Sequence, residues 1–270
     1  MLSQAVGTVV HVGLELPASL SPSKVVSFRD CALAFKYSVI DRLPEPPSEP
    51  ACKGTLVHKA LELLYQREPA DRTVENALAD LDAAWGEVMG VGEYADLVLA
   101  DEDAFRASAR TLVKRYFTLE DPTTIRPIGL ELFLSTPLND KVNLRGIIDR
   151  LELDEDGGLV VTDYKTGKVP GERQEQGRLT GVHFYSYLCE QLFGRRPARI
   201  QLLYLGEPVA IIATPSEQST RGLERKVGAI WTAIERACDR DDFRPKPSGL
   251  CGWCAYKDLC PAFGGAAIAS

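Results

Sequence analysis

Asp149, Asp163 and Lys165 are the residues of this chain whose types and spacing point most directly to chemistry. They flank the turn-rich stretch Asp-Glu-Asp-Gly-Gly at 154–158. If the two flanking segments pair antiparallel about the centre of that turn, Asp149 faces Asp163, and the two-residue period of a strand returns Lys165 to the same face. Two carboxylates repel each other unless a cation lies between them. The spacing therefore predicts an Mg²⁺ or Mn²⁺ site here, with the Tyr164 carbonyl nearby and an ammonium placed to orient a water or a phosphate oxygen.

A solvated hairpin with acidic surface residues is the alternative, and the acids at the tip of the turn fit it. Asp149 and Asp163 differ, because their predicted face is otherwise apolar and carries Ile147, Leu151, Leu153, Leu159 and Val161. Carboxylates on an apolar face need a partner. A slip of one residue in the pairing would separate the two acids.

Seven cysteines suggest a second site. An odd number in a chain without an export signal argues against a disulfide framework. Cys251, Cys254 and Cys260 form a Cys-x2-Cys-x5-Cys array, which predicts three thiolate ligands in one loop. A fourth ligand completes either a tetrahedral zinc site or an iron–sulfur cluster, and spacing alone does not separate the two. The candidates for that fourth ligand are Cys31, Cys52, Cys189 and Cys238.

The composition is that of an ordinary globular protein of 270 residues, with 45% hydrophobic and 26% charged residues. The net charge of −7 is local: residues 68–103 hold 11 acidic residues and a single arginine, and the remainder carries 30 basic against 27 acidic residues. That remainder permits a basic groove for nucleic acid without requiring one. No apolar run approaches the roughly 20 residues that cross a bilayer, so we expect a cytoplasmic protein without a membrane partner.

Apolar periodicity and turn residues predict an α/β protein with a mixed sheet flanked by helices. A helix is expected from Ser21-Pro22-Ser23 to about residue 40, with Cys31 inside it, and another is expected to open at Gly54-Thr55, with His58 on its first turn. We interpret residues 70–120 as an acidic helical insertion in one domain that spans 1–270. The remaining predicted strands are 128–135, 142–153, 159–163, 199–204 and 209–213, and the remaining helices are 179–193 and 218–238.

Five segments occur in the order typical of one family: Ser21-Pro22-Ser23 leading to Cys31, Gly54-Thr55-Leu56-Val57-His58, Gly146-Ile147-Ile148-Asp149, Asp163-Tyr164-Lys165-Thr166-Gly167 and the closing cysteine array. In this order the chain resembles the RecB-family nucleases of the PD-(D/E)XK superfamily. It is most similar to the stand-alone bacterial RecB-like exonucleases, and to the CRISPR-associated and AddB-type nucleases that bind a [4Fe-4S] cluster. The resemblance implies a restriction-endonuclease-like core with a mixed central sheet and a cysteine-rich carboxyl end.

The resemblance also implies roles for individual residues. His58, Asp149 and Asp163 would bind the catalytic metal, with the Tyr164 carbonyl completing its protein ligands and Lys165 assisting the attacking water. Glu131 matches an acidic position near the family's metal and is expected as a further ligand or base, with a surface role as the alternative. Cys31 would join Cys251, Cys254 and Cys260 around a [4Fe-4S] cluster, so that residues 21–40 and 245–263 form a clasp.

The chain departs from the family pattern in two places. Ala32 follows the first cluster cysteine, where proline is common. The helix after Lys165 lacks the usual Gln four residues before a Tyr, because Gly181 precedes Tyr185 and His183 precedes Tyr187 at that spacing. These two tyrosines are candidates for DNA contact, with packing in the core as the alternative.

We therefore expect a metal-dependent DNA exonuclease that prefers single strands with a free end and acts in repair or recombination. Two alternatives remain at this stage. One is a non-catalytic scaffold that binds DNA ends, and the other is a nuclease module that works only with a helicase or integrase partner. No Gly-Lys-Ser/Thr loop of a helicase motor occurs in the sequence.

Overall fold

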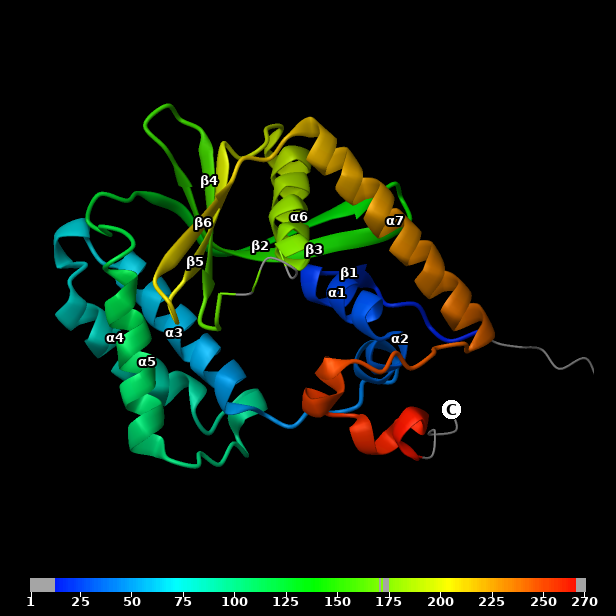
Figure 1. The fold of residues 1–270 in the computed structure, drawn as a ribbon. Helices are drawn as coiled ribbons and strands as arrows, with labels where there is room; N and C mark the ends of the chain where they lie inside the picture. The colour runs from blue at the N-terminus through cyan, green and yellow to red at the C-terminus, as the bar shows by residue number, and fades with distance from the viewer. Residues whose placement is uncertain (1–12, 170, 172–174, 266–270) are drawn as a thin grey trace, which may run out of the picture. The chain divides into compact units, whose positions relative to one another are not determined.

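The computed structural model describes residues 13–169, 171 and 175–265. Within them the chain divides into two compact units (Figure 1). One, here called the terminal unit, contains residues 13–45, 138–143 and 224–265. The other, the sheet unit, contains the described part of 46–137 and 144–223. No helix in the described part of the chain is both long enough and apolar enough to cross a membrane.

The sheet unit is built from five strands and four long helices. The strands are β2 (Pro127–Leu138), β3 (Val142–Leu153), β4 (Leu159–Lys165), β5 (Arg199–Tyr204) and β6 (Val209–Ala213). The helices are α3 (Glu49–Gln66), α4 (Val74–Val88), α5 (Glu102–Tyr116) and α6 (Glu175–Phe193). β3 pairs antiparallel with β4, β4 pairs parallel with β5, and β5 pairs antiparallel with β6, while β2 pairs with β3. The predicted mixed sheet is confirmed.

The core of the sheet unit lies between α3, α4 and α5 and the adjacent face of β4 and β5. Leu56, Ala60 and Leu64 recur at helical spacing along α3 and are fully buried there, together with Leu81 of α4 and Val113 of α5. Tyr164 of β4 and Leu203 of β5 belong to the same cluster. The helices of residues 70–120 therefore belong to the principal core, and Asp80 of α4 is buried with it and paired with Arg67 at 2.6 Å.

Two predictions about α3 are wrong. The helix begins at Glu49 rather than at Gly54, because Ser48 caps it by accepting from the Ala51 amide and Pro50 is tolerated in a first turn. His58 consequently lies in the middle of the helix rather than on its first turn.

The terminal unit is mostly helical. Its elements are β1 (Ser19–Leu20), α1 (Pro22–Asp30), α2 (Ala32–Phe35), a π-helical turn (Lys36–Ile40), the greater part of α7 (Glu217–Arg240), and three short 3-10 turns (Gly249–Trp253, Lys257–Leu259 and Pro261–Phe263). Ser21 caps α1, as expected for the Ser-Pro-Ser start. Cys31, however, is not inside a helix: its backbone is extended, with φ of −159° and ψ of 110°, and separates α1 from α2.

Candidate metal site and cysteine cavity

The β3–β4 hairpin has the pairing predicted from the sequence. Leu151 pairs with Val161 and Leu153 with Leu159, so continuing the register places Asp149 opposite Asp163. The tip acid Asp154 shapes the turn, because its Oδ1 accepts from the Gly158 amide at 2.6 Å. Asp149 and Asp163 are buried, with 7% and 5% of their surface exposed. Two carboxylates are thus held in a poorly solvated place, where each raises the cost of charging the other.

Asp149, Tyr164 and His58 are joined by short polar contacts. The Tyr164 amide donates to Asp149 Oδ2 at 2.6 Å. His58, projecting from α3, lies 3.0 Å through Nε2 from the Tyr164 carbonyl and 3.5 Å through Nδ1 from Asp149 Oδ2. Since a carbonyl only accepts, Nε2 carries the proton, and in the neutral ring the Nδ1 lone pair is left for a metal ion.

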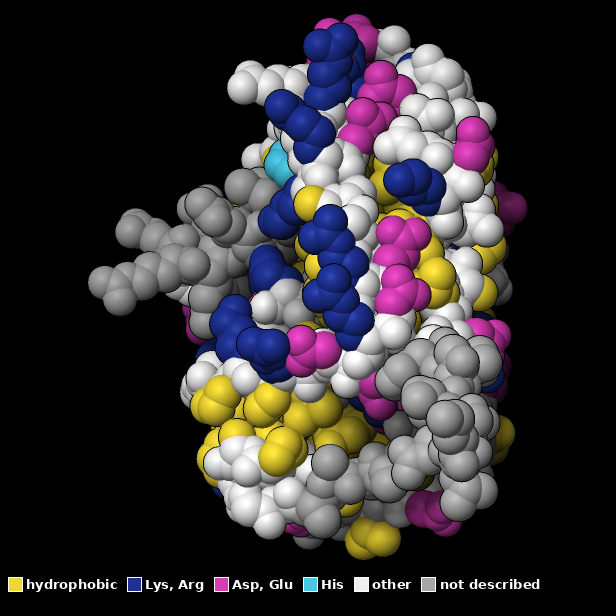
Figure 2. Space-filling model, turned by 90° about the vertical axis from the view of Figure 1, so that its right-hand side faces the viewer, with side chains coloured by type: hydrophobic (Ala, Val, Ile, Leu, Met, Phe, Trp, Pro, Cys, Tyr) yellow, Lys and Arg dark blue, Asp and Glu magenta, His cyan; other side chains and the backbone are white. Residues whose placement is uncertain are grey.

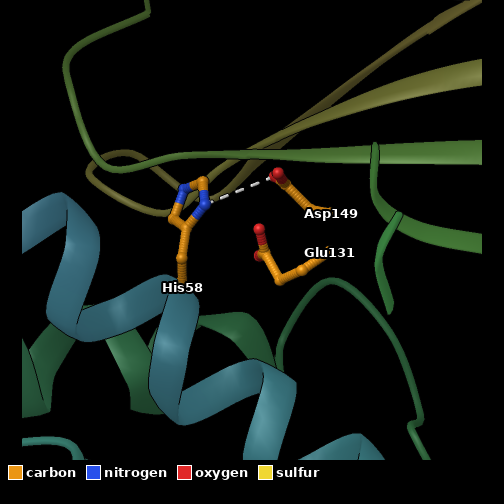
Figure 3. A group of neighbouring side chains, drawn as sticks. All are labelled: His58, Glu131 and Asp149. Atoms are coloured by element: carbon orange, nitrogen blue, oxygen red, sulfur yellow. Dashed lines mark ion pairs between the residues drawn. The ribbon is translucent and has the colours of Figure 1, made fainter. Parts of the chain in front are cut away.

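Glu131 completes a group that could hold a metal ion. One ligand atom each from His58, Glu131 and Asp149 lies within 4.8 Å of the others, and Figure 3 shows the three side chains converging. Glu131 lies inside β2 with a φ of +44°, a left-handed conformation that is costly for a residue with a side chain. The surface alternative does not describe this position, because the side chain is half-buried beside Asp149.

Lys165 is bound to Asp163 rather than free in solvent. Its Nζ lies 2.5 Å from Asp163 Oδ2, and the lysine side chain keeps 42% of its surface exposed. The ammonium is therefore anchored at a buried carboxylate while still reachable from outside, as a group that contacts a phosphate must be.

The acidic side chains of the candidate metal site, together with His58, favour the binding of positive charge. Burial, reinforced by Asp149, raises the pKa of Asp163 from 3.8 to about 6, although Lys165 opposes the change. Burial and the Asp149 charge raise the pKa of Glu131 from 4.5 to about 7. Burial alone would lower the pKa of His58, but its hydrogen bond to Asp149 and the surrounding carboxylates raise it to about 9. Each raised pKa marks a position where negative charge is favourably neutralised, by a proton or by a divalent cation.

A buried polar network, which the sequence analysis missed, lies behind the hairpin. Arg150 is completely buried and points away from Asp149, as strand alternation requires. Its guanidinium donates to both oxygens of Glu120 at 2.9 Å, to Glu152 at 2.7 Å and to the Tyr164 hydroxyl at 2.9 Å. Further contacts of the same group are to Tyr65, Tyr116 and Thr162. The sequence did contain a signal for this network. Arg150 directly follows Asp149, and strand alternation places it on the opposite, buried face.

Tyr164 therefore connects the network to the candidate metal site. Its hydroxyl accepts from Arg150, while its amide and its carbonyl contact Asp149 and His58. The residue whose carbonyl oxygen is predicted to be a metal ligand is therefore held through its side chain, its amide and its carbonyl.

Gly146, Tyr185 and Tyr187 mark the packing of α6 against this part of the sheet unit (Figure 1). A Cβ at Gly146 would lie 3.0 Å from Leu188 Cδ1 and 3.3 Å from the Tyr185 ring, so these two side chains of α6 would have to shift to admit it. Both tyrosines are buried, and the Tyr187 hydroxyl donates to the Pro137 carbonyl at 3.1 Å. Burial raises the pKa of Tyr185, and the nearby charges of Asp163, Asp149 and Glu131 raise it further. This environment favours the packing alternative, and their DNA contact stays a prediction.

The four cysteines selected by the resemblance lie around one cavity of the terminal unit. Its volume is about 300 Å³, and Cys31, Cys251, Cys254 and Cys260 all line it. Two tyrosines hold the cysteine loop against the amino-terminal segment: Tyr37 donates to the Leu259 carbonyl at 3.2 Å, and Tyr256 donates to the Leu43 carbonyl at 3.1 Å.

The other three cysteines are buried and lie elsewhere. Burial raises the pKa of Cys52, of Cys189 and of Cys238, which keeps each of them a neutral thiol. The seven cysteines are all free thiols in the structure. The cavity thus brings together the four half-buried cysteines and leaves out the three that pack as apolar side chains.

A family model and one solved structure agree with this architecture. The family model described as the PD-(D/E)XK nuclease superfamily matches residues 19–261. A solved structure from Eubacterium rectale, named as a candidate exonuclease, has a TM-score of 0.54 at 12% identity, with 88% of each chain covered. The solved structure of SSO0001 has a TM-score of 0.44 at 11% identity, with 92% of this chain and 88% of that chain covered. No curated protein matches the chain in sequence.

Proposed function

Because the chain belongs to the PD-(D/E)XK nuclease superfamily, we propose that it is a metal-dependent DNA exonuclease of the RecB-like type. The observation that carries the proposal is the convergence of His58, Glu131 and Asp149 beside the Asp163–Lys165 pair. Carboxylate oxygens suit Mg²⁺ or Mn²⁺, and one imidazole with several carboxylates is a donor set that Mn²⁺ accepts well.

In this proposal His58, Asp149, Asp163 and the Tyr164 carbonyl would hold a divalent ion, with Glu131 as a further ligand or as the base. When bound, the ion supplies positive charge to the phosphodiester that is cleaved. The chain's own groups then do the rest. Lys165, fixed by Asp163, donates to the attacking water or to a non-bridging phosphate oxygen. Glu131, with a pKa of about 7, is suited to accept a proton near neutral pH.

We further propose that the substrate is a DNA strand with a free end, single strands being preferred, and that the setting is repair or recombination. The charge distribution supports this preference, because the acidic segment at 68–103 repels DNA from one part of the surface.

The decisive experiment is digestion of end-labelled linear and covalently closed single-stranded DNA with Mg²⁺, with Mn²⁺ and with EDTA. We expect the linear strand alone to be degraded, and only with metal. Asp163→Asn should abolish the activity, whereas Asp156→Asn, at the exposed tip of the same hairpin, should not. Degradation of circles at the linear rate would contradict the exonuclease assignment, and cleavage in EDTA would contradict metal dependence.

We also propose a [4Fe-4S] cluster on Cys31, Cys251, Cys254 and Cys260. Four thiols around one cavity are a donor set for a cluster or for zinc, and the family resemblance favours the cluster. Protein purified without oxygen should be brown and contain iron and acid-labile sulfide in equal amounts. A colourless protein with one zinc per chain would overturn the assignment.

A further inference from the structure

A second surface hollow lies in the terminal unit, away from the cysteine cavity. Its volume is about 260 Å³, and α1, α2, α7 and the segment after α7 line it. Small side chains of alanine and threonine make up most of its lining, together with one phenylalanine, two arginines and one aspartate. The lining residues are Phe28, Ala32, Ala229, Thr232, Ala233, Arg236, Ala237, Arg240 and Asp242.

Arg236 and Arg240 are placed to act together. They are four residues apart on α7, so their side chains leave the helix on the same face. Both are exposed, and neither forms an ion pair with a carboxylate of the described chain within 4.0 Å. Figure 2 shows Lys and Arg side chains in a band, with a row of Asp and Glu side chains beside it, on the face that α7 occupies.

The single carboxylate of the hollow does not neutralise these arginines. Asp242 is bound by Arg244, with Nε at 2.9 Å from one carboxylate oxygen and Nη2 at 3.0 Å from the other. The charge of Arg240 also acts on Asp242, but Arg236, Arg240 and Arg244 together outnumber this one carboxylate and leave a net positive charge. A guanidinium pair of this kind suits an anion with several oxygens, above all a phosphate.

Phe28 and the small side chains of the hollow suit a flat apolar group beside that anion. Phe28 is half-buried and stands edge-on to Phe35, with ring centroids 5.2 Å apart, so its orientation is fixed. Ala229, Ala233 and Ala237 recur every four residues and leave room above the helix. A nucleotide carries a flat base and a phosphate on one sugar, and a base enters a hollow most easily from a single strand, where no pairing has to be broken.

We propose that the hollow binds one nucleotide of single-stranded DNA, with a phosphate on Arg236 and Arg240 and its base over Ala233 against Phe28. This inference rests on the proposed function insofar as it takes DNA as the partner. It adds a contact in the terminal unit to the candidate metal site of the sheet unit.

The test is binding of a fluorescent 20-residue oligothymidylate in EDTA, measured by anisotropy at several NaCl concentrations. Arg236→Ala/Arg240→Ala should weaken binding at least about tenfold at low salt and flatten the plot of log affinity against log salt by about 0.7, since the two arginines share one phosphate and each phosphate contact to a single strand contributes about 0.7. The matched control is Arg244→Ala, which removes an exposed arginine already paired with Asp242 and should leave the slope unchanged.

A second pair of variants distinguishes binding in the hollow from binding by charge alone. Ala233→Phe fills the hollow without changing charge and should also weaken binding, whereas Ala107→Phe, on an exposed face of α5, should not. Circular dichroism of each variant checks the fold. Arg236→Lys/Arg240→Lys keeps both charges and should retain the salt slope while losing affinity.

Several results would overturn the inference. Wild-type affinity and salt slope in both the double alanine variant and Ala233→Phe would do so. Equal binding of a duplex with the same dependence on the arginines would show a contact to the backbone alone. Binding of an acidic peptide but not of the oligonucleotide would identify a protein partner instead. If the wild-type protein cleaves no DNA with metal yet binds it through these arginines, the nuclease proposal fails and this one stands.

Discussion

Lys165 combines an anchored ammonium with an open approach. Asp163 holds its Nζ at 2.5 Å, and 42% of the side chain is exposed. Few lysines satisfy both conditions, because an exposed lysine is usually mobile and a buried one is usually inaccessible. This placement is what the proposed chemistry needs from a group that contacts a phosphate oxygen or a water.

Lys165→Ala should reduce DNA cleavage by several orders of magnitude, because the charge it brings to the phosphate is lost while no core contact is removed. Cleavage of end-labelled single strands is the measurement, with thermal unfolding as the check on folding. Lys168→Ala, three residues further on and exposed, should cleave at the wild-type rate. Equal loss in both variants, or near-normal cleavage by Lys165→Ala, would argue against this role.

The raised pKa values at the candidate metal site predict a link between metal and pH. A group whose pKa is higher in the folded than in the unfolded chain stabilises the fold at low pH, and that contribution is lost as pH rises through the folded value. This stabilising contribution is lost between about pH 3.8 and 6 for Asp163, between 4.5 and 7 for Glu131 and between 6.5 and 9 for His58. A cation replaces those protons, so its stabilising effect should grow as pH rises.

We therefore expect Mn²⁺ to raise the Tm of EDTA-treated protein more at pH 8 than at pH 6. For each proton displaced, the apparent affinity for the metal should increase up to about tenfold per pH unit. Asp156→Asn should behave like the wild type. A shift in Tm of equal size at both pH values would show that the metal does not bind at these groups.

At the scale of the element, β3 and β4 present different chemistry on their two faces. One face carries Asp149 and Asp163, and the other carries Arg150 and the Tyr164 ring. The buried guanidinium is neutralised by Glu120 and Glu152 and saturated with hydrogen bonds, as a buried charge must be. The hairpin is thus held in place from the face opposite to the candidate metal site.

Tyr164→Phe tests whether this network positions the candidate metal site. Without the hydroxyl, an N–H group of Arg150 loses one hydrogen-bond acceptor, which should lower the free energy of unfolding by about 1–3 kcal/mol. Tyr164, whose carbonyl and amide contact His58 and Asp149, is then held less firmly. The Mg²⁺ concentration that gives half-maximal cleavage should rise about threefold to tenfold, with a smaller change in kcat at saturating metal.

Tyr116→Phe is the matched control for that measurement. It removes another hydroxyl within reach of Arg150, but from α5, which carries no residue of the candidate metal site. Its Tm should fall while its Mg²⁺ requirement stays normal. If both variants shifted the Mg²⁺ requirement equally, the network would be structural only.

At the scale of the whole molecule, the four cysteines that line one cavity come from segments far apart in sequence. Cys31 follows α1 near one end, and the other three cysteines lie in the loop near the other end. A cluster bound by all four would close almost the entire chain into one loop, which stabilises the fold by restricting the unfolded chain.

Cys251→Ala should therefore lose bound iron and become sensitive to limited proteolysis near both ends of the chain. Cys189→Ala supplies the contrast: it opens a small space beneath a fully buried thiol and should lower the Tm, yet retain iron. Full iron content in Cys251→Ala would remove this residue from the proposed ligand set.

Local sequence was sufficient for the hairpin and for most of the strands. The turn at 154–158 and the two-residue alternation determine that Asp149, Asp163 and Lys165 share a face, and the observed pairing confirms the register. The cysteine array was equally readable, since its members lie within one short loop.

Tertiary structure decided what depends on contacts between distant segments. Ser48 extends α3 beyond Gly54, and the extended backbone of Cys31 interrupts the expected helix, because capping and packing override local propensity. The left-handed Glu131 is tolerated only where surrounding structure holds it, and periodicity does not report that. The partners of Arg150 come from α3, from β4 and from the segment after α5, so only the folded chain could reveal that the charge behind Asp149 is satisfied.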